Sequence, residues 1–115
     1  MVAGGTGLIT QMRRGTLEFC VMALLRNEKL YGFDLVRKLS DVDGLVTSEG
    51  TIYPLLSRLR RDGLVKTFWR ESPAGPPRRY YELTTAGTKA LDAFSEEWDR
   101  FSTAVSLLIK GEDQS

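Results

Sequence analysis

Apolar residues recur at spacings of three and four along three segments in the first half of the chain, and this period predicts helices. The segments cover about 16–26, about 32–40, and 49 to about 61. The first is apolar on nearly every side, so we expect its helix to be buried by more than one neighbour. The third follows Ser48, a favourable N-cap residue, and ends before Gly63, which suits the position after a helix. Pro54 lies inside this third segment, where it is tolerated only near the start of a helix.

After Gly63 the pattern changes. Segments 65–70 and 78–83 are rich in β-branched and aromatic residues, which predicts two strands. The stretch 72–77 between them contains three prolines and a glycine, a composition typical of a turn. We therefore expect a β-hairpin, whose prolines discourage pairing with other strands.

A final helix is expected from a cap at Thr84 or Thr85 to about Lys110. Its apolar positions alternate in steps of three and four, as in a coiled-coil seam. The preceding elements already bury their own faces, so we expect the seam, together with the first helix, to form a homodimer; packing on the chain's own body is the alternative. The expected interface residues are Leu91, Phe94, Trp98, Phe101, Val105 and Leu108.

This order of elements predicts a fold class that is mainly α with a small β-hairpin: a winged helix-turn-helix followed by a long C-terminal dimerisation helix. The expected organisation is a DNA-binding domain at 1–84 with a flexible start at 1–7, the dimerisation helix at 85–110, and a tail at 111–115.

The composition excludes several classes of protein. The chain has 115 residues, a size typical of one domain, and no histidine, which removes imidazole-based catalysis and zinc ligation. With no metal cluster or phosphate-binding glycine loop either, we expect no cofactor, no metal and no enzyme activity. No apolar stretch is long enough to span a membrane, and no signal peptide is expected. The single cysteine, Cys20, favours a cytoplasmic protein and is interpreted as a small buried apolar residue.

The formal net charge of +1 conceals an uneven distribution. Residues 48–84 carry seven Lys or Arg against four Asp or Glu, whereas residues 85–115 carry three against six. The middle of the chain is therefore basic and the end acidic, which favours a cationic face for nucleic acid.

A helix docked by its Leu and Ile stripe exposes its N-terminal face, which fits the major groove of double-stranded DNA. Short hydroxyl side chains suit base edges and arginines suit phosphates. Gly50 keeps the start of the helix slim, and the hairpin is expected to bring Arg70 and its other arginines beside the same surface. The expected DNA contacts are Ser48, Gly50, Thr51, Tyr53, Ser57, Arg58, Arg78 and Arg79.

These residues also have plainer interpretations. Thr51 belongs equally well to an ordinary solvated face, Tyr53 to the packing beneath the hairpin, and the arginines to any exposed surface. A winged helix also serves as a protein-interaction module, and this is the alternative function. The basic hairpin and the hydroxyl-rich helix favour DNA.

Several short motifs resemble the PadR family of bacterial transcription regulators over about residues 12–90. The pairing of the Ser48–Pro54 motif with an Arg-Tyr-Tyr strand is the most specific part of the likeness. The matching stretches are Arg14-Gly15-Thr16-Leu17-Glu18, Tyr31-Gly32-Phe33, Ser48-Glu49-Gly50-Thr51-Ile52-Tyr53-Pro54, Arg58-Leu59, Asp62-Gly63-Leu64 and Arg79-Tyr80-Tyr81-Glu82-Leu83-Thr84.

The single C-terminal helix with a central Trp98 resembles the small PadR subgroup. The resemblance implies a homodimeric repressor that binds an inverted repeat, with aromatic compounds as effectors in some members. The hairpin tip departs from the family, in which it is often Gly-rich and basic. This departure leaves open how deeply the tip contacts DNA.

Trp98 also carries an expectation of its own. It is either a bulky interface residue or one wall of a gap between two copies, into which a small planar aromatic effector inserts. The residues expected to bind the effector are Met12, Phe19, Phe94, Trp98 and Phe101.

Overall fold

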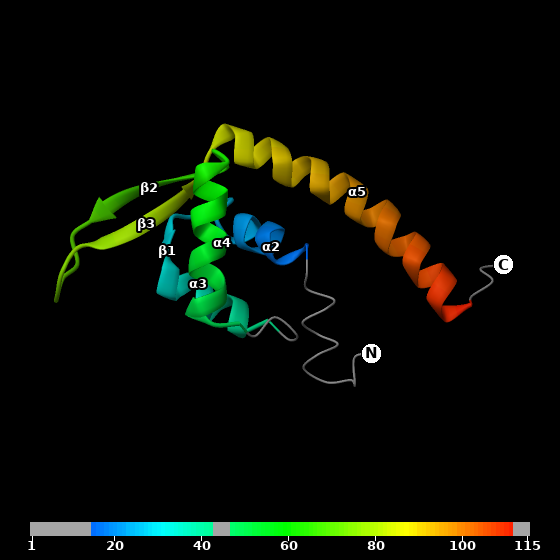
Figure 1. The fold of residues 1–115 in the computed structure, drawn as a ribbon, viewed down its shortest axis with the longest axis horizontal. Coiled ribbons are helices and arrows are strands. Elements are labelled where there is room, and N and C mark those ends of the chain that lie inside the picture. Colours follow the sequence, from blue (N-terminus) through cyan, green and yellow to red (C-terminus); the bar gives the residue numbers. More distant parts are fainter. Residues whose placement is uncertain (1–14, 43–46, 112–115) are drawn as a thin grey trace.

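The computed structural model of the chain describes residues 15–42 and 47–111 (Figure 1). It confirms the predicted fold class, a mainly helical chain with a small antiparallel sheet and a long final helix. Residues 1–7, Met12 and most of the tail lie outside the described residues. The elements are α2 (Leu17–Leu24), β1 (Leu30–Tyr31), α3 (Gly32–Ser40), α4 (Glu49–Arg61), β2 (Val65–Arg70), β3 (Arg78–Leu83) and α5 (Thr85–Lys110).

The sheet has three strands where the sequence predicted two. The antiparallel order is β1-β3-β2, and β1 pairs Leu30 with Tyr81 and Tyr31 with Tyr80. A strand of two residues is too short to show a period of its own. Tyr31, just before the predicted second helix, lies in β1 and is the extended N-cap residue of α3.

One hydrophobic core joins the helices to one face of the sheet. The apolar stripe of α4 is buried as predicted, with Ile52, Leu56 and Leu59 at most 1% exposed. Val65 of β2 and Tyr81 of β3 close the core from the sheet side, and Leu83 packs against it. Burial of one such leucine contributes about 1.5–3 kcal/mol, which fixes the orientation of α4 on the body.

Both ends of α4 follow from its sequence. At the C-terminus Gly63 adopts a positive φ of 78°, and the amides of Gly63 and Leu64 bond to the carbonyls of Arg60 and Leu59, the Schellman arrangement that the glycine predicted. At the N-terminus Ser48 holds the N-cap position without a side-chain cap bond, and its hydroxyl lies 3.4 Å from that of Thr51. Pro54 lies inside α4, in its second turn, as the predicted helix range implies. It is exposed, so the backbone carbonyl that it leaves without a donor faces water.

The start of α5 is fixed to the end of α4. The hydroxyl of Thr84 accepts a hydrogen bond from the amide of Gly87 at 3.0 Å and donates one to the carbonyl of Gly63 at 2.7 Å. The Thr84 amide also donates to the carbonyl of Leu64 at 3.1 Å. The predicted cap is thus the point where α4, the sheet and α5 meet (Figure 1).

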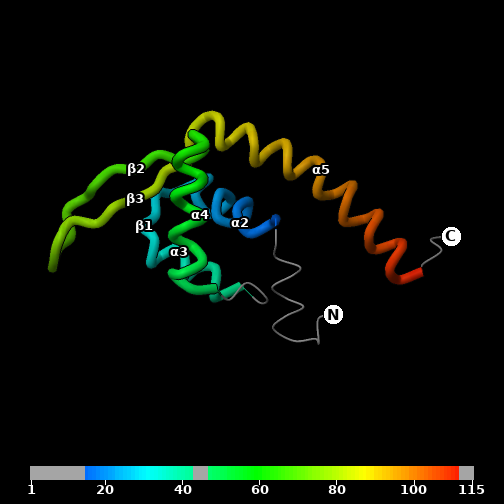
Figure 2. Tube along the Cα trace, in the orientation of Figure 1, coloured from blue at the N-terminus to red at the C-terminus, as the bar shows by residue number. Residues whose placement is uncertain are grey.

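The first turns of α5 pack on α2, and the rest of the helix runs away from the body (Figure 2). Leu91 is 5% exposed, the rings of Phe19 and Phe94 stack at 4.0 Å, and Arg26 pairs with Asp92 at 3.1 Å. The expectation that the whole seam is free of its own chain is therefore wrong for Leu91 and Phe94. The molecule is consequently long and thin, at 56 × 32 × 22 Å. No helix of the described part of the chain combines the length and hydropathy needed to cross a membrane.

Candidate nucleic-acid interface

The outward side of α4 carries most of the residues that the sequence predicted for DNA. The opposite stripe is buried, so the side chains between the stripe positions face solvent. The exposed set includes Ser48, Gly50, Thr51, Tyr53, Ser57 and Arg58, together with Arg60 and Arg61 near the end of the helix. Hydroxyls and an open glycine thus occupy the first turns, and cations occupy the last.

Gly50 has no packing role within the described structure. A Cβ built on this residue would meet only the Ser48 hydroxyl, at an ordinary contact distance of 3.7 Å. Alanine is a better helix former than glycine, and nothing in residues 15–42 and 47–111 favours glycine at this position. The bare backbone at this position is the part of α4 that another molecule can approach most closely.

Tyr53 is partly packed on the body of the chain and partly exposed. Its side chain lies across Gly32, where any Cβ would collide with the ring, and yet 39% of the residue is exposed. Partial burial, with the Glu49 carboxylate second, raises the pKa of the Tyr53 phenol. The hydroxyl therefore remains a protonated donor at the edge of the exposed side of α4.

Arg58 already has a partner within the chain. Its guanidinium donates to the carboxylate of Glu18 on α2, and both side chains are partly exposed. This ion pair ties α4 to α2. A phosphate that binds Arg58 would have to share it with Glu18.

The hairpin places Arg79 on one face and Arg70 and Arg78 on the other, so the expectation that its arginines line one surface is wrong. Arg79 lies over the ring of Trp69 at 5.4 Å, on the side of the buried Tyr81. Arg78 lies over the ring of Tyr31 at 4.6 Å, on the side of Tyr80. Successive strand residues point to opposite faces, so adjacent arginines separate in this way.

Trp69 was not predicted as a site residue. It is 65% exposed and lies beside Arg79 near the end of the hairpin, on the same face as the core. The period of two, counted from buried Val65, places Trp69 on this face. The alternation of residues in β2 was therefore the signal that could have identified it.

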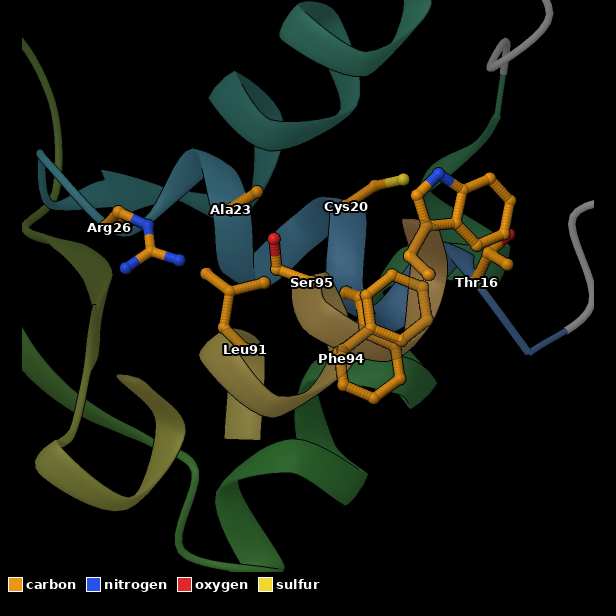
Figure 3. A pocket seen from close by; sticks show the side chains of 9 residues that line it. Thr16, Cys20, Ala23, Arg26, Leu91, Phe94 and Ser95 are labelled. Carbon is orange, nitrogen blue, oxygen red and sulfur yellow. The ribbon is translucent and has the colours of Figure 1, made fainter. Parts of the chain in front are cut away.

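A pocket of about 470 Å³ lies between α2 and α5 (Figure 3). Phe19, Phe94 and Trp98, which the sequence assigned to a gap between two copies, line this pocket within one chain. Phe101 lies outside it, with its ring centroid 6.5 Å from that of Trp98. Arg26 lies at one end and Thr16 at the other. The lining residues that the sequence did not identify are Thr16, Cys20, Ala23, Arg26, Leu91 and Ser95.

The chemistry of this pocket suits binding better than catalysis. Its walls are mainly apolar, with one guanidinium at the edge. Burial raises the pKa of the Cys20 thiol, which keeps it in the unreactive protonated form. Residues 15–42 and 47–111 contain no group of three His, Cys, Asp or Glu placed to hold a metal ion.

The chain resembles known proteins over most of its length. The model of the transcriptional regulator PadR-like family matches residues 21–93. A PadR-like transcriptional regulator from Bacillus cereus is 38% identical, with 89% of this chain and 99% of that one covered and a TM-score of 0.79. A PadR family regulator from Eggerthella lenta is 33% identical, with 93% of each chain covered and a TM-score of 0.82. An uncharacterised protein of Lysinibacillus sphaericus is 23% identical over 100 residues, which are 85% of this chain and 92% of that one. The chain therefore belongs to the PadR-like family of transcriptional regulators, which are DNA-binding winged-helix proteins and not enzymes.

Proposed function

We propose that this regulator is a cytoplasmic repressor that binds an inverted-repeat operator as a homodimer and is released by a planar aromatic effector. In this scheme residues 1–84 read the DNA and residues 85–110 join the two copies. The observation that carries the proposal is the exposed first half of α4, where hydroxyls surround a glycine that no packing contact with the described residues requires.

The α4 surface supports direct reading of a major groove. Thr51, Ser48 and Ser57 present small hydroxyls to base edges, and Gly50 lets the helix backbone come close. Arg79 and Arg58 reach phosphates on either side. Two copies of α4, one helical turn of DNA apart, would read half-sites separated by roughly 34 Å.

The outer half of α5 supports a dimer. Beyond the pocket its apolar side chains have no cover within the described chain, and Phe101, Leu108 and Ile109 are 63%, 83% and 76% exposed. Exposed apolar surface of this kind is typical of a protein interface. A second copy running along the same helix would bury Trp98, Phe101, Val105 and Leu108.

The pocket supports an aromatic effector. Phe19, Phe94 and Trp98 form a continuous row of rings, with centroids 4.0 and 5.7 Å apart. Flat apolar molecules stack on such rings. An effector releases the DNA only if it binds the released conformation more tightly than the bound one. It would do so here by changing how α5 lies on α2.

The substitution Gly50→Ala tests the reading surface. The operator is first obtained by selecting bound fragments from the host genome. Because alanine favours the helix, the variant should unfold no earlier than the wild type, while its affinity for the operator falls at least tenfold. Unchanged operator affinity in Gly50→Ala, measured by fluorescence anisotropy, would contradict the proposed contact.

Arg79→Ala tests a phosphate contact. It should weaken binding to operator and random duplexes alike and reduce the slope of log affinity against log salt concentration by about 0.9.

The effector is tested in a protein with one tryptophan. Trp69→Phe leaves Trp98 as the only indole, so its emission reports the pocket alone. Planar aromatic compounds should quench it and should weaken operator binding over the same concentration range. Phe94→Ala, which keeps the Trp98 indole as reporter, should abolish both responses. Sedimentation should give twice the mass of 12.9 kDa, and a single chain at every concentration would overturn the dimer.

A further inference from the structure

The sheet has a second face, turned away from the helices, that the proposed function does not use. We call it the outer sheet face and define it by the strand register and ring contacts. Its neighbours on the inner side, such as Val65 and Tyr81, belong to the core. The outer sheet face consists of Lys29, Tyr31, Lys66, Phe68, Arg70, Arg78, Tyr80 and Glu82.

Three aromatic rings cross this face from one edge strand to the other. Tyr80 on the central strand lies 5.5 Å from Tyr31 on β1 and 5.8 Å from Phe68 on β2, measured between ring centroids. All three residues are partly buried. The three rings form a continuous aromatic layer, and longer side chains lie on it.

Arginine and lysine side chains cover this aromatic layer. Arg70 lies 4.5 Å from the centroid of the Tyr80 ring and 5.3 Å from that of Phe68, while Arg78 lies 4.6 Å from Tyr31. Lys29 adds an ammonium 5.9 Å from the Phe68 ring. A guanidinium stacked on a ring keeps its N–H edges free and loses less freedom when it binds an anion. The arginines are thus held in place with donors available.

The charge of this face is strongly one-sided. It carries four cations against the carboxylate of Glu82. Glu28, next to Lys29, pairs with Lys38 at 3.7 Å, and Glu71 follows Arg70 just beyond the end of β2. Lys29, Lys66 and Glu82 also border a hollow of about 380 Å³ beside Phe68. Cations spread over β2, β3 and the residue before β1 suit an extended polyanion better than one small anion.

The chemistry favours a phosphate backbone over an acidic protein segment. A protein partner needs exposed apolar surface or pockets for its anchoring side chains. Here the rings are covered by the cations, so the outermost layer is charge. Arginine forks match phosphate oxygens, and double-stranded DNA presents one negative charge per roughly 1.7 Å of its axis.

A duplex bound to α4 meets the opposite side of the sheet, since α4 packs on the inner face through β2. We therefore infer that the outer sheet face binds the phosphate backbone of a second DNA duplex, so that the operator-bound regulator bridges two DNA molecules. The inference rests on the proposed function for the first duplex only. Once the operator holds the protein, neighbouring DNA meets this face at a high effective concentration.

A capture assay tests the bridge. Biotinylated operator duplex is fixed on beads and saturated with the full-length protein, and a fluorescent duplex of random sequence is added. The wild type should retain the second duplex at low salt and release it as salt rises. The double variant Lys66→Ala/Arg70→Ala should retain at least tenfold less, while its affinity for the operator in solution changes by less than twofold.

The matched control is Lys89→Ala/Lys110→Ala, which removes the same charge from exposed positions of α5 and should bridge like the wild type. Loss of Arg70 could disturb the packing of the rings, so Lys66→Gln is tested alone as well. This variant should reduce retention of the second duplex severalfold. No retention by the wild type, or equal retention by the double variant and the control, overturns the inference. Release of the second duplex by polyglutamate as readily as by competitor DNA would assign the face to acidic proteins and also overturn it.

The assay also separates the two proposals. If the protein binds operator and random duplexes equally, the proposed function fails, and the bridge is then measured between two random duplexes. If operator binding is specific and bridging is absent, only the bridge fails.

Discussion

The two halves of α5 share one sequence pattern and have different surroundings. In the first half Gly87 and Leu91 are buried against the body, and Phe94 stacks on Phe19. In the second half the same three-four spacing continues to Leu108, which is 83% exposed. An apolar stripe therefore specifies that a face is to be covered and leaves open which surface covers it. The following substitutions test this difference, beginning with the largest expected effect on stability.

Leu91→Ala should cost the most. The side chain belongs to the core, so its loss removes apolar contacts and leaves a cavity, at about 3 kcal/mol. Chemical denaturation should show this loss to the same extent at low and high protein concentration, because the contact lies within one chain. A loss that grows with protein concentration would place Leu91 at an interface between copies.

Gly87→Ala should lower stability by about 2 kcal/mol through overpacking. A Cβ at this position would collide with the carbonyl of Leu64 and lie 2.7 Å from the Leu83 side chain. Gly50→Ala is the matched control, since it makes the same change near the start of a helix with open space above it. The two variants should shift the thermal midpoint in opposite directions, and a stabilised Gly87→Ala would show that the contact between α5 and β3 is loose.

Thr84→Ala removes both hydrogen bonds of the cap hydroxyl and should cost about 1 kcal/mol. Thr84→Ser keeps the hydroxyl and should recover most of the loss. Hydrogen exchange provides the more specific measurement, because the amide of Gly87 should lose protection in the alanine variant and regain it in the serine variant. Equal exchange in both variants would mean that the hydroxyl does not cap α5.

Leu108→Ala should change the free energy of unfolding of a dilute single chain by less than about 0.5 kcal/mol, because the side chain is already exposed. It carries the same chemical change as Leu91→Ala on the same helix. If α5 is the proposed dimer seam, the loss should appear only as protein concentration rises into the dimer range. Sedimentation at several concentrations measures this, and an unchanged dimer would exclude Leu108 from the seam.

The sequence predicted the elements whose patterns are local. The ranges of α3, β2 and β3 agree with the predicted ones, because turns and caps close each of them within a few residues. The glycine after α4 was identified for the same reason. By contrast, β1 is only two residues long and gains its identity from pairing with β3, fifty residues later in the sequence.

The site residues divide in the same way. The exposed residues of α4 followed from one helical period, whereas Arg78 and Arg79 required the phase of the strand. That phase was already present in the alternation from Val65 to Trp69. The lining of the pocket could not be predicted from a helical or a strand period. Arg26 and Ser95 come together only when α2 and α5 pack, and this packing depends on tertiary structure.

The junction at Thr84 fixes the direction in which α5 leaves the rest of the chain. The end of α4 and the root of the hairpin are bonded to the base of a helix of 26 residues. At the usual rise per residue α5 is about 39 Å long, so a tilt of about 5° at the Thr84 junction displaces the far end of the helix by about 3 Å. A dimer joined near the C-terminal ends of the two α5 helices would therefore restrict the angle of each α5 to a narrow range. Through the junction at Thr84 such a dimer would also set the distance between the two α4 helices.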